Sequence, residues 1–585
     1  MAASSPVHAC FRAQCGICGR ALVAGDRFIP LISSELSAES PPCLKGAKFP
    51  RGNVVSLDYH GRTLCWRHKC QQCKHASRAV GVHSECFVLF RRECSLEDAL
   101  DRLWVAVLSR SPWWFALNAR VDGSADCPQD MELVYEKADK IGLSAWRLLP
   151  PELTQLIHDS SESAPFWLWL SALSFIRDLS GEDSSDGSSY ISVPLANVLA
   201  WTRGSAPIIT AEEEGPPIVR LTSDCRGLKR VERLDSMPSY RDWRSDTMEF
   251  AIQDLGLVKN VTAEFKYNIM RLETPDMKHG LHIWDMPGPP SLEDCKFCGH
   301  IGHSMRFSTI DLHVVTGLTF FFSHNKVYAV HAHTASSPNA TKTFEQFSRL
   351  RQASVVWVYL PLPKGEEIIS FGIRLKEVDG RPVTQMPCFM FRTKLAGEVV
   401  LGPLPVRNSS QDVLLAPSYP KLLIHNIPEF GPITAFGAFA PENDDSVPGF
   451  SDTAPSNVPS SPTLFSSAAS LESVTCIQVF GNKRTGAPAG ILFYYENGAQ
   501  RAVGNCRIGL DKVQTYDKPT RLCWHSLMER HELRVIYKFD SGNSSRHCHT
   551  SHRDPQYHDV WVCNDLKGTM EFWFSEEDSS LLMPR

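Results

Sequence analysis

The sequence predicts a multidomain α+β protein with a metal-braced N-terminal segment, a short helical part and a large all-β C-terminal half. Three observations support this prediction. The chain has 585 residues, which is too long for one hydrophobic core. Cysteine and histidine pairs with the spacing of metal ligands are concentrated before residue 95. From about residue 305, short β-rich runs broken by turn residues replace helical patterns.

Four pairs of possible metal ligands lie in series near the N-terminus. They are Cys15 and Cys18, Cys65 and His68, Cys70 and Cys73, and His83 and Cys86. A pair with two intervening residues on a tight turn can bind one ion, and two pairs complete the tetrahedral shell of a structural zinc ion. We therefore expect one or two structural Zn²⁺ ions in a zinc-finger-like segment over residues 10–94. A metal-free, cysteine-rich core is the alternative, which the polar neighbours of the pairs disfavour.

The order of these pairs resembles that of a cross-braced RING or treble-clef finger. The resemblance implies that the first and third pairs share one ion, and that the second and fourth pairs share the other. Two spacings depart from the RING pattern, because 46 residues separate Cys18 from Cys65 and one residue separates His68 from Cys70. A structural role is therefore favoured over RING-type ligase activity.

Composition excludes several classes of function. The net charge of −5 argues against a nucleic-acid partner for the whole molecule. No run reaches the ~18 apolar residues of a membrane span, and no signal peptide is visible. Nineteen cysteines in ligand-like spacings indicate reduced thiols and a cytoplasmic or nuclear location. The nucleophile elbow, Walker loop and zinc-protease helix are absent, so no enzymatic activity is expected.

Two helical segments follow the cysteine-rich region. Over 95–125, apolar residues at helical spacing after Ser95 predict a helix that packs against the finger. Over 145–202, Pro150 and Pro151 pre-set a helix start, and Leu153, Leu156 and Ile157 form its apolar face. Residues 203–304 are predicted only as a mixed connecting region.

The run Leu148-Leu-Pro-Pro-Glu-Leu153 resembles the opening of an F-box. An F-box docks onto the Skp adaptor of a cullin–RING ubiquitin ligase, so the resemblance implies that Leu149, Pro150 and Leu153 contact a Skp-type adaptor. The alternative is a helical pair that packs only internally.

The C-terminal half divides into residues 305–440, a disordered Pro/Ser/Asp-rich linker over 441–470, and a second β segment over 471–585. Runs beginning at Gly317, Cys388 and Gly490 share an aromatic pattern, which suggests repeated hairpins. Whether the two β segments form one domain or two stays open.

The pieces Gly317-Leu-Thr-Phe-Phe-Phe322, Lys364–Gly372, Phe389–Gly397 and Ile433–Gly437 resemble a jacalin-type β-prism over about 305–440. In jacalin-like lectins, an Asp before the last strand binds sugar hydroxyls. In this sequence, Thr434 occupies that position. The charge-assisted contact is therefore missing, and the fold is expected without lectin activity.

Together the segments resemble F-box-like proteins of filamentous fungi, a family that implies no assigned chemistry. The predicted function is a non-enzymatic adaptor that recruits protein substrates to a cullin–RING ligase through its β-rich region. The alternative is an intracellular, zinc-stabilised β-prism module that binds a protein or glycan and has no ubiquitin role.

Overall fold

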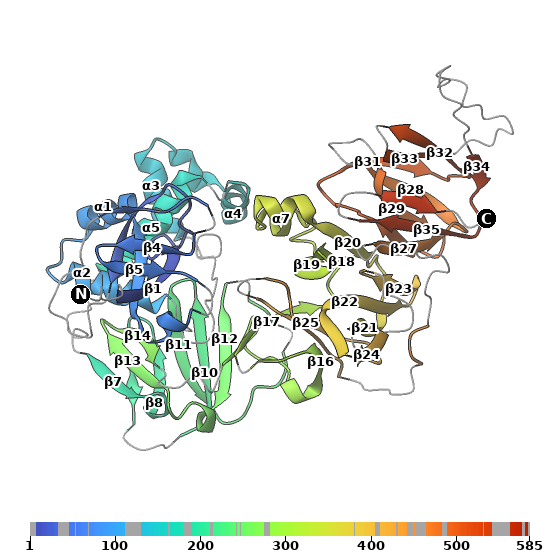
Figure 1. Ribbon diagram of the computed structural model, residues 1–585. Helices are drawn as coiled ribbons and strands as arrows, with labels where there is room; N and C mark the ends of the chain where they lie inside the picture. The colour runs from blue at the N-terminus through green and yellow to red at the C-terminus, as the bar shows by residue number, and fades with distance from the viewer. Residues whose placement is uncertain are drawn as a thin grey trace, which may run out of the picture. The chain divides into compact units, whose positions relative to one another are not determined.

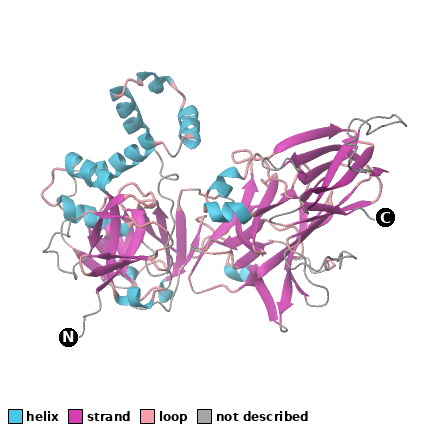
Figure 2. Ribbon diagram, turned by 45° about the horizontal axis from the view of Figure 1, so that its top comes forward, coloured by secondary structure: helices cyan, strands magenta, loops and turns pink. Residues whose placement is uncertain are grey.

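The structure is a computed structural model, in which the chain divides into two compact units (Figure 1). The first comprises Met1–Pro289 and Gly302–Arg306, and the second Pro290–Ile301 and Phe307–Arg585. The structure is mostly β with few helices, including strands in the N-terminal half where the sequence predicted none, and Figure 2 shows the helices and strands. It describes residues 7–32, 46–52, 54–67, 70–110, 130–161, 164–180, 190–210, 215–241, 243–245, 247–273, 281–302, 304–378, 381–403, 410–428, 431–441, 448–451, 464–481, 488–529, 532–540, 562–575 and 579–582.

The first unit begins with a six-stranded sheet in the order β3-β2-β6-β1-β5-β4. Strand β1 is parallel to both of its neighbours: Cys10 lies opposite Cys65 of β5, and Ala9 lies opposite Ser77 of β6. This register places the two ends of β1 beside different cysteine-bearing turns. The elements are β1 (Val7–Cys15), β2 (Arg27–Ile32), β3 (Ala47–Lys48), β4 (Ser56–Tyr59), β5 (Arg62–Cys65), the 3₁₀ turn η1 (Gln71–His75) and β6 (Ser77–His83).

Helices α1 (Ser84–Glu93), α2 (Ala99–Ser109) and α5 (Pro165–Leu179) share a core with residues of this sheet. A Cβ atom added to Gly16, in the first ligand turn, would lie 2.6 Å from Val107 Cβ of α2. The expected packing of this helix against the finger is therefore confirmed. Between α2 and α5 lie α3 (Met131–Lys140), η2 (Ser144–Leu148) and α4 (Pro151–Ser160), which starts at a proline as predicted.

The mixed region of the sequence forms two further sheets around a core of its own, which includes Trp201, Leu221 and Phe265. One sheet has the order β15-β12-β10-β11-β8-β9 and the other β14-β13-β7. The elements are β7 (Ile191–Pro194), η4 (Leu195–Asn197), β8 (Val198–Thr202), β9 (Ile208–Ile209), β10 (Ile218–Asp224), β11 (Gly227–Leu234), β12 (Glu249–Asp254), η5 (Leu255–Leu257), β13 (Thr262–Lys266), β14 (Ile269–Glu273) and β15 (His282–Trp284).

The second unit opens with three sheets whose inner faces share one core. Their orders are β16-β26-β25-β17, β19-β18-β20 and β23-β22-β21-β24. The Phe389 ring of β22 lies 4.4 Å from that of Phe320 in β18 and 4.9 Å from that of Phe436 in β26, between ring centroids. One aromatic side chain therefore joins all three sheets.

The elements of this part are η6 (Leu292–Asp294), β16 (Cys295–Gly299), β17 (Met305–Asp311), β18 (Gly317–Ser323), β19 (Lys326–His333), α6 (Thr341–Glu345), α7 (Arg349–Ser354), β20 (Val356–Pro361), β21 (Ile368–Val378), β22 (Arg381–Thr393), β23 (Gly397–Leu401), β24 (Ser410–Ala416), β25 (Leu422–Asn426) and β26 (Ala435–Phe439).

The C-terminal β segment belongs to the same unit and the same core. Phe465 of β27 lies 5.3 Å from Phe322 of β18, between ring centroids. Residues 465–470, expected in a disordered linker, instead form β27, because the Phe465 side chain fills this core. The elements are β27 (Phe465–Ser470), β28 (Val474–Gly481), β29 (Pro488–Tyr495), β30 (Gln500–Gly504), β31 (Lys512–Asp517), β32 (Arg521–Glu529), β33 (Glu532–Asp540), β34 (Val562–Asp565), β35 (Thr569–Phe574) and β36 (Ser579–Leu582).

The three aromatic runs that recur in the sequence become β18, β22 and β29, and each pairs with a strand on both sides. Consecutive residues of these runs are buried, so both faces of each strand are covered, which explains their continuous apolar character. None of the helices in the described ranges combines the length and apolar character needed to cross a bilayer. Cys225 is disulfide-bonded, so the expectation of reduced thiols is wrong at this position.

Candidate metal centres and an exposed leucine face

The first cluster of possible ligands consists of Cys15, Cys18, His83 and Cys86. Cys15 ends β1, Cys18 lies on the following turn, His83 ends β6, and Cys86 lies in the first turn of α1. All four ligand atoms lie within 4.8 Å of one another. The arrangement can hold a metal ion between a tight turn and the start of a helix.

The turn that carries the first two cysteines is fixed by backbone hydrogen bonds. Gly19 N–H donates to the Cys15 carbonyl over 2.9 Å, and Cys15 N–H donates to the Arg20 carbonyl over 2.8 Å. Gly19 has φ of 78°, a conformation that residues with a Cβ atom adopt at a cost. The glycine therefore lets the chain turn back sharply enough to bring Cys15 and Cys18 together.

His83 is oriented by contacts on both ring nitrogens. Its Nδ1 lies 3.4 Å from Cys18 Sγ and 4.0 Å from Cys86 Sγ, so Nδ1 is the ring atom placed to bind an ion. On the opposite side, Nε2–H donates to Asp26 Oδ2 over 3.3 Å. A carboxylate in this position fixes the tautomer and makes the ligating nitrogen more basic.

The protonation states in the first cluster depend on the close contacts among its four side chains. Burial disfavours the charged ring of His83, but hydrogen bonds and charge from Cys15 and Cys18 outweigh it and raise the pKa of His83 to about 11. Burial likewise opposes ionisation of Cys15, yet hydrogen bonds from Cys18, Cys86 and His83 lower the pKa of that thiol well below its usual value. The cluster thus favours a thiolate at its centre, the form of cysteine that binds metals.

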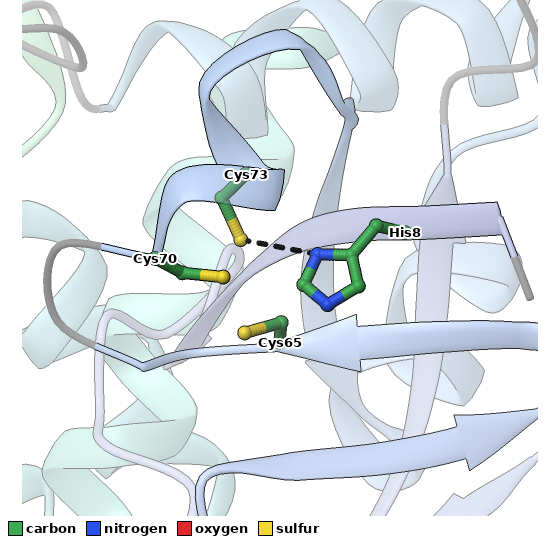
Figure 3. Close-up of side chains that lie close together, drawn as sticks. All are labelled: His8, Cys65, Cys70 and Cys73. Carbon is green, nitrogen blue, oxygen red and sulfur yellow. Dashed lines mark hydrogen bonds between the residues drawn. The ribbon is translucent and has the colours of Figure 1, made fainter. Parts of the chain in front are cut away.

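The second cluster consists of His8, Cys65, Cys70 and Cys73. Figure 3 shows the three sulfur atoms and the His8 ring turned toward a common point, from β1, from the end of β5 and from the η1 turn. Cys73 Sγ lies 3.4 Å from His8 Nδ1. This cluster is less buried than the first, since Cys65 alone among its four members is fully buried.

The predicted cross-braced pairing is wrong. Cys15 and Cys18 join His83 and Cys86, whereas Cys70 and Cys73 join Cys65. The register of β6 against β1 explains the outcome. Strand β6 begins opposite Ala9, so the η1 turn that precedes it lies beside His8. Further along, Gly81 of β6 lies opposite Cys15, so His83 lies beside the turn that carries Cys15 and Cys18. Spacing along the chain cannot reveal such a register.

Sequence reasoning missed His8 and included His68. His8 is not part of a pair with two intervening residues, and its only signal is alternation with Cys10 on one face of a strand. His68 lies outside the described residues. The other seven predicted ligands all belong to one of the two clusters.

Helix α4 turns its leucines outward. Leu153 is 46% exposed and Leu156 60% exposed, whereas Thr154 and His158 are 2% and 3% exposed. Residues at i, i+3 and i, i+4 share a helix face, so the polar face is the packed one. The cause is α5, whose Trp167 ring meets the His158 ring edge-on at 4.9 Å between centroids. The expected apolar face is therefore divided: Ile157 packs against the core, and the two leucines do not.

The other predicted docking residues flank this helix. Leu149 is half-buried where η2 ends, and Pro150 is exposed. Leu148, just before them, is 85% exposed. In the C-terminal unit, the backbone N–H of Thr434 donates to Asn426 Oδ1 over 2.9 Å, so the residue at the lectin position helps to close its own loop.

Comparison of the sequence with protein-family models and with curated proteins finds no match. The functional interpretation therefore depends on the residues and their geometry.

Proposed function

We propose that this protein is a non-enzymatic, F-box-like adaptor that recruits protein substrates to a cullin–RING ubiquitin ligase. The observation that carries the proposal is the exposed leucine face of η2 and α4: Leu148, Leu153 and Leu156. A helical pair that served only internal packing would turn these side chains inward. Scattered exposed leucines are common, but three within nine residues, two of them on a helix whose buried face is polar, are typical of a docking surface.

The β-rich second unit is the proposed recognition region. Its three sheets around one core are consistent with the β-prism suggested by the sequence. A glycan ligand is disfavoured because Thr434 supplies no carboxylate for sugar hydroxyls. A protein ligand accords with the adaptor role.

Zn²⁺ is the proposed ion at both clusters, in a structural role. Zinc bond lengths of about 2.3 Å to sulfur and about 2.0–2.1 Å to nitrogen place tetrahedral S and N ligands about 3.6 Å apart. The observed distances from Cys18 to His83 and from Cys73 to His8 are both 3.4 Å. Three thiolates and one neutral imidazole around a divalent ion give each centre a net charge of about −1. Thiolate-rich donor sets select zinc over oxygen-preferring ions.

The test is association with a purified Skp-type adaptor, using the full-length chain and a Leu153→Asp/Leu156→Asp variant. Both leucines are exposed, so the variant is expected to keep the fold and the thermal midpoint while losing Skp binding. Leu350→Asp is the matched control, because Leu350 is also on a helix and is 85% exposed. It should bind like the wild type.

Equal Skp binding by the double variant and the wild type would refute the adaptor proposal. Absence of binding by the wild type would do the same, and would favour the stand-alone binding module. Leu149→Asp/Leu153→Asp tests the residues that the sequence motif itself implies.

A further inference from the structure

Cys10 is a fifth potential ligand beside the second cluster. It lies two residues after His8 on β1, so both side chains are on the same face of the strand. It is directly opposite Cys65 in the parallel register, and its thiol is hydrogen-bonded to that of Cys73. A tetrahedral ion needs four ligands, and His8, Cys65, Cys70 and Cys73 already supply them. Cys10 is thus a spare thiol in contact with a ligand thiol.

The two clusters differ in their accessibility. In the first, Cys15 and Cys18 are buried, at 1% and 3% exposure. In the second, Cys70, Cys73 and the adjacent Cys10 are all partly exposed. A small oxidant in solution can therefore reach the second cluster more readily than the first.

We propose that the second cluster is a peroxide-sensitive thiol site, in which Cys10 and Cys73 form a disulfide and the bound metal ion is released. The proposal rests on metal binding at this cluster and is independent of the adaptor role. It gives a function to Cys10, which is needed neither as a metal ligand nor to fill the core beside β1.

The chemistry uses one molecule of hydrogen peroxide. With an ion bound, the Cys73 sulfur would be held as a thiolate, because a metal-bound thiol is deprotonated. This sulfur attacks one peroxide oxygen, the O–O bond breaks, and hydroxide leaves as Cys73 becomes a sulfenic acid. The Cys10 sulfur then attacks the Cys73 sulfur, the S–O bond breaks, and the oxygen leaves as water with the Cys10 proton. Two sulfur atoms together lose two electrons, and peroxide is reduced to water and hydroxide. Only His8, Cys65 and Cys70 would then remain to hold a bound ion.

The experiment treats the zinc-loaded, full-length protein with hydrogen peroxide. Released zinc is followed with a chromogenic chelator, and the linked peptides are identified by mass spectrometry. One ion per chain should be released, with Cys10 joined to Cys73, and a dithiol should restore zinc binding. The ion of the first cluster, in which Cys15 and Cys18 are buried, should stay bound, which provides an internal reference.

Cys10→Ser is the decisive variant, because it leaves all four ligands in place. It should bind two zinc ions and lose the peroxide-induced release, and Cys10→Ala should behave in the same way. Cys94→Ser is the matched control: Cys94 is a buried thiol of the same unit outside both clusters, so this variant should respond like the wild type.

Two results would overturn the inference. Release of zinc from Cys10→Ser at the wild-type rate would show that the ligand thiols are oxidised without Cys10. Binding of only one ion by Cys10→Ser and Cys10→Ala before oxidation would identify Cys10 as a ligand.

Discussion

Replacing Asp26 by Asn tests whether the first cluster is a metal centre with an oriented histidine. Asp26 Oδ2 accepts hydrogen bonds from His83 Nε2–H over 3.3 Å and from Val23 N–H over 2.8 Å. The Asn side chain keeps the shape of Asp26 and removes its charge. Loss of a carboxylate partner of a metal-bound histidine typically lowers metal affinity 10–100-fold, or by about 1.4–2.7 kcal/mol. The same loss is expected here.

The assay is competition for zinc between the full-length protein and a chelating dye. With two centres, the wild type should give two phases, and Asp26→Asn should shift one of them by one to two decades. Asp58→Asn is the matched control, since Asp58 is an exposed aspartate of the same sheet that accepts from Thr63 Oγ1. It should leave both phases unchanged.

The reasoning fails if Asp26→Asn titrates like the wild type, because the contact to His83 would then contribute nothing to metal binding. It also fails if both phases shift equally, since the effect would then be a general loss of stability. A thermal melt of the zinc-loaded variant separates that outcome from a local one.

Three further predictions concern stability. His333 donates from Nδ1 to the Pro338 carbonyl over 2.8 Å, and burial lowers its pKa to about 4. The unfolded ring protonates near pH 6.5, whereas the folded ring stays neutral until about pH 4. The free energy of unfolding should therefore fall by about 3 kcal/mol as the pH drops from 6.5 to 4. In thermal melts, His333→Gln should flatten this dependence on pH. Phe389→Ala should cost about 3–5 kcal/mol in urea unfolding, since its ring joins three sheets; a cost below 1 kcal/mol would contradict the shared core. Gly81→Ala should cost about 1–3 kcal/mol, because the added Cβ would lie 2.6 Å from Leu22 Cδ1, whereas Gly449→Ala, with open space around it, should be neutral.

Local features of the fold were predictable because they depend on neighbouring residues. Pro151 at the first position of α4 pre-sets the backbone dihedral and lacks the N–H that a helix start leaves unpaired. The run of aromatic residues from Gly317 identified a buried strand, since both of its faces are covered. The turn at Cys15 and Cys18 was recognisable because its two ligands lie within one short turn.

The features that were missed depend on contacts between distant residues. Residues 203–304 have short apolar pieces whose strand character emerges only when they pair, as when Ile218–Ser223 aligns with both β11 and β12. The outward leucines of α4 follow from the packing of Trp167 against His158, which no pattern within α4 contains.

The sequence by itself indicated that the N-terminus carries paired metal-ligand residues sufficient for one or two ions, that a proline-started helix follows them and that strands fill the C-terminal half. Each of these conclusions needs only residue type and local spacing. The tertiary structure decided which of these residues could share an ion, that His8 is among them, and that Cys10 lies beside them. The physical reason is the register of the parallel strands β1, β5 and β6, which brings residues more than fifty positions apart to within reach of one ion.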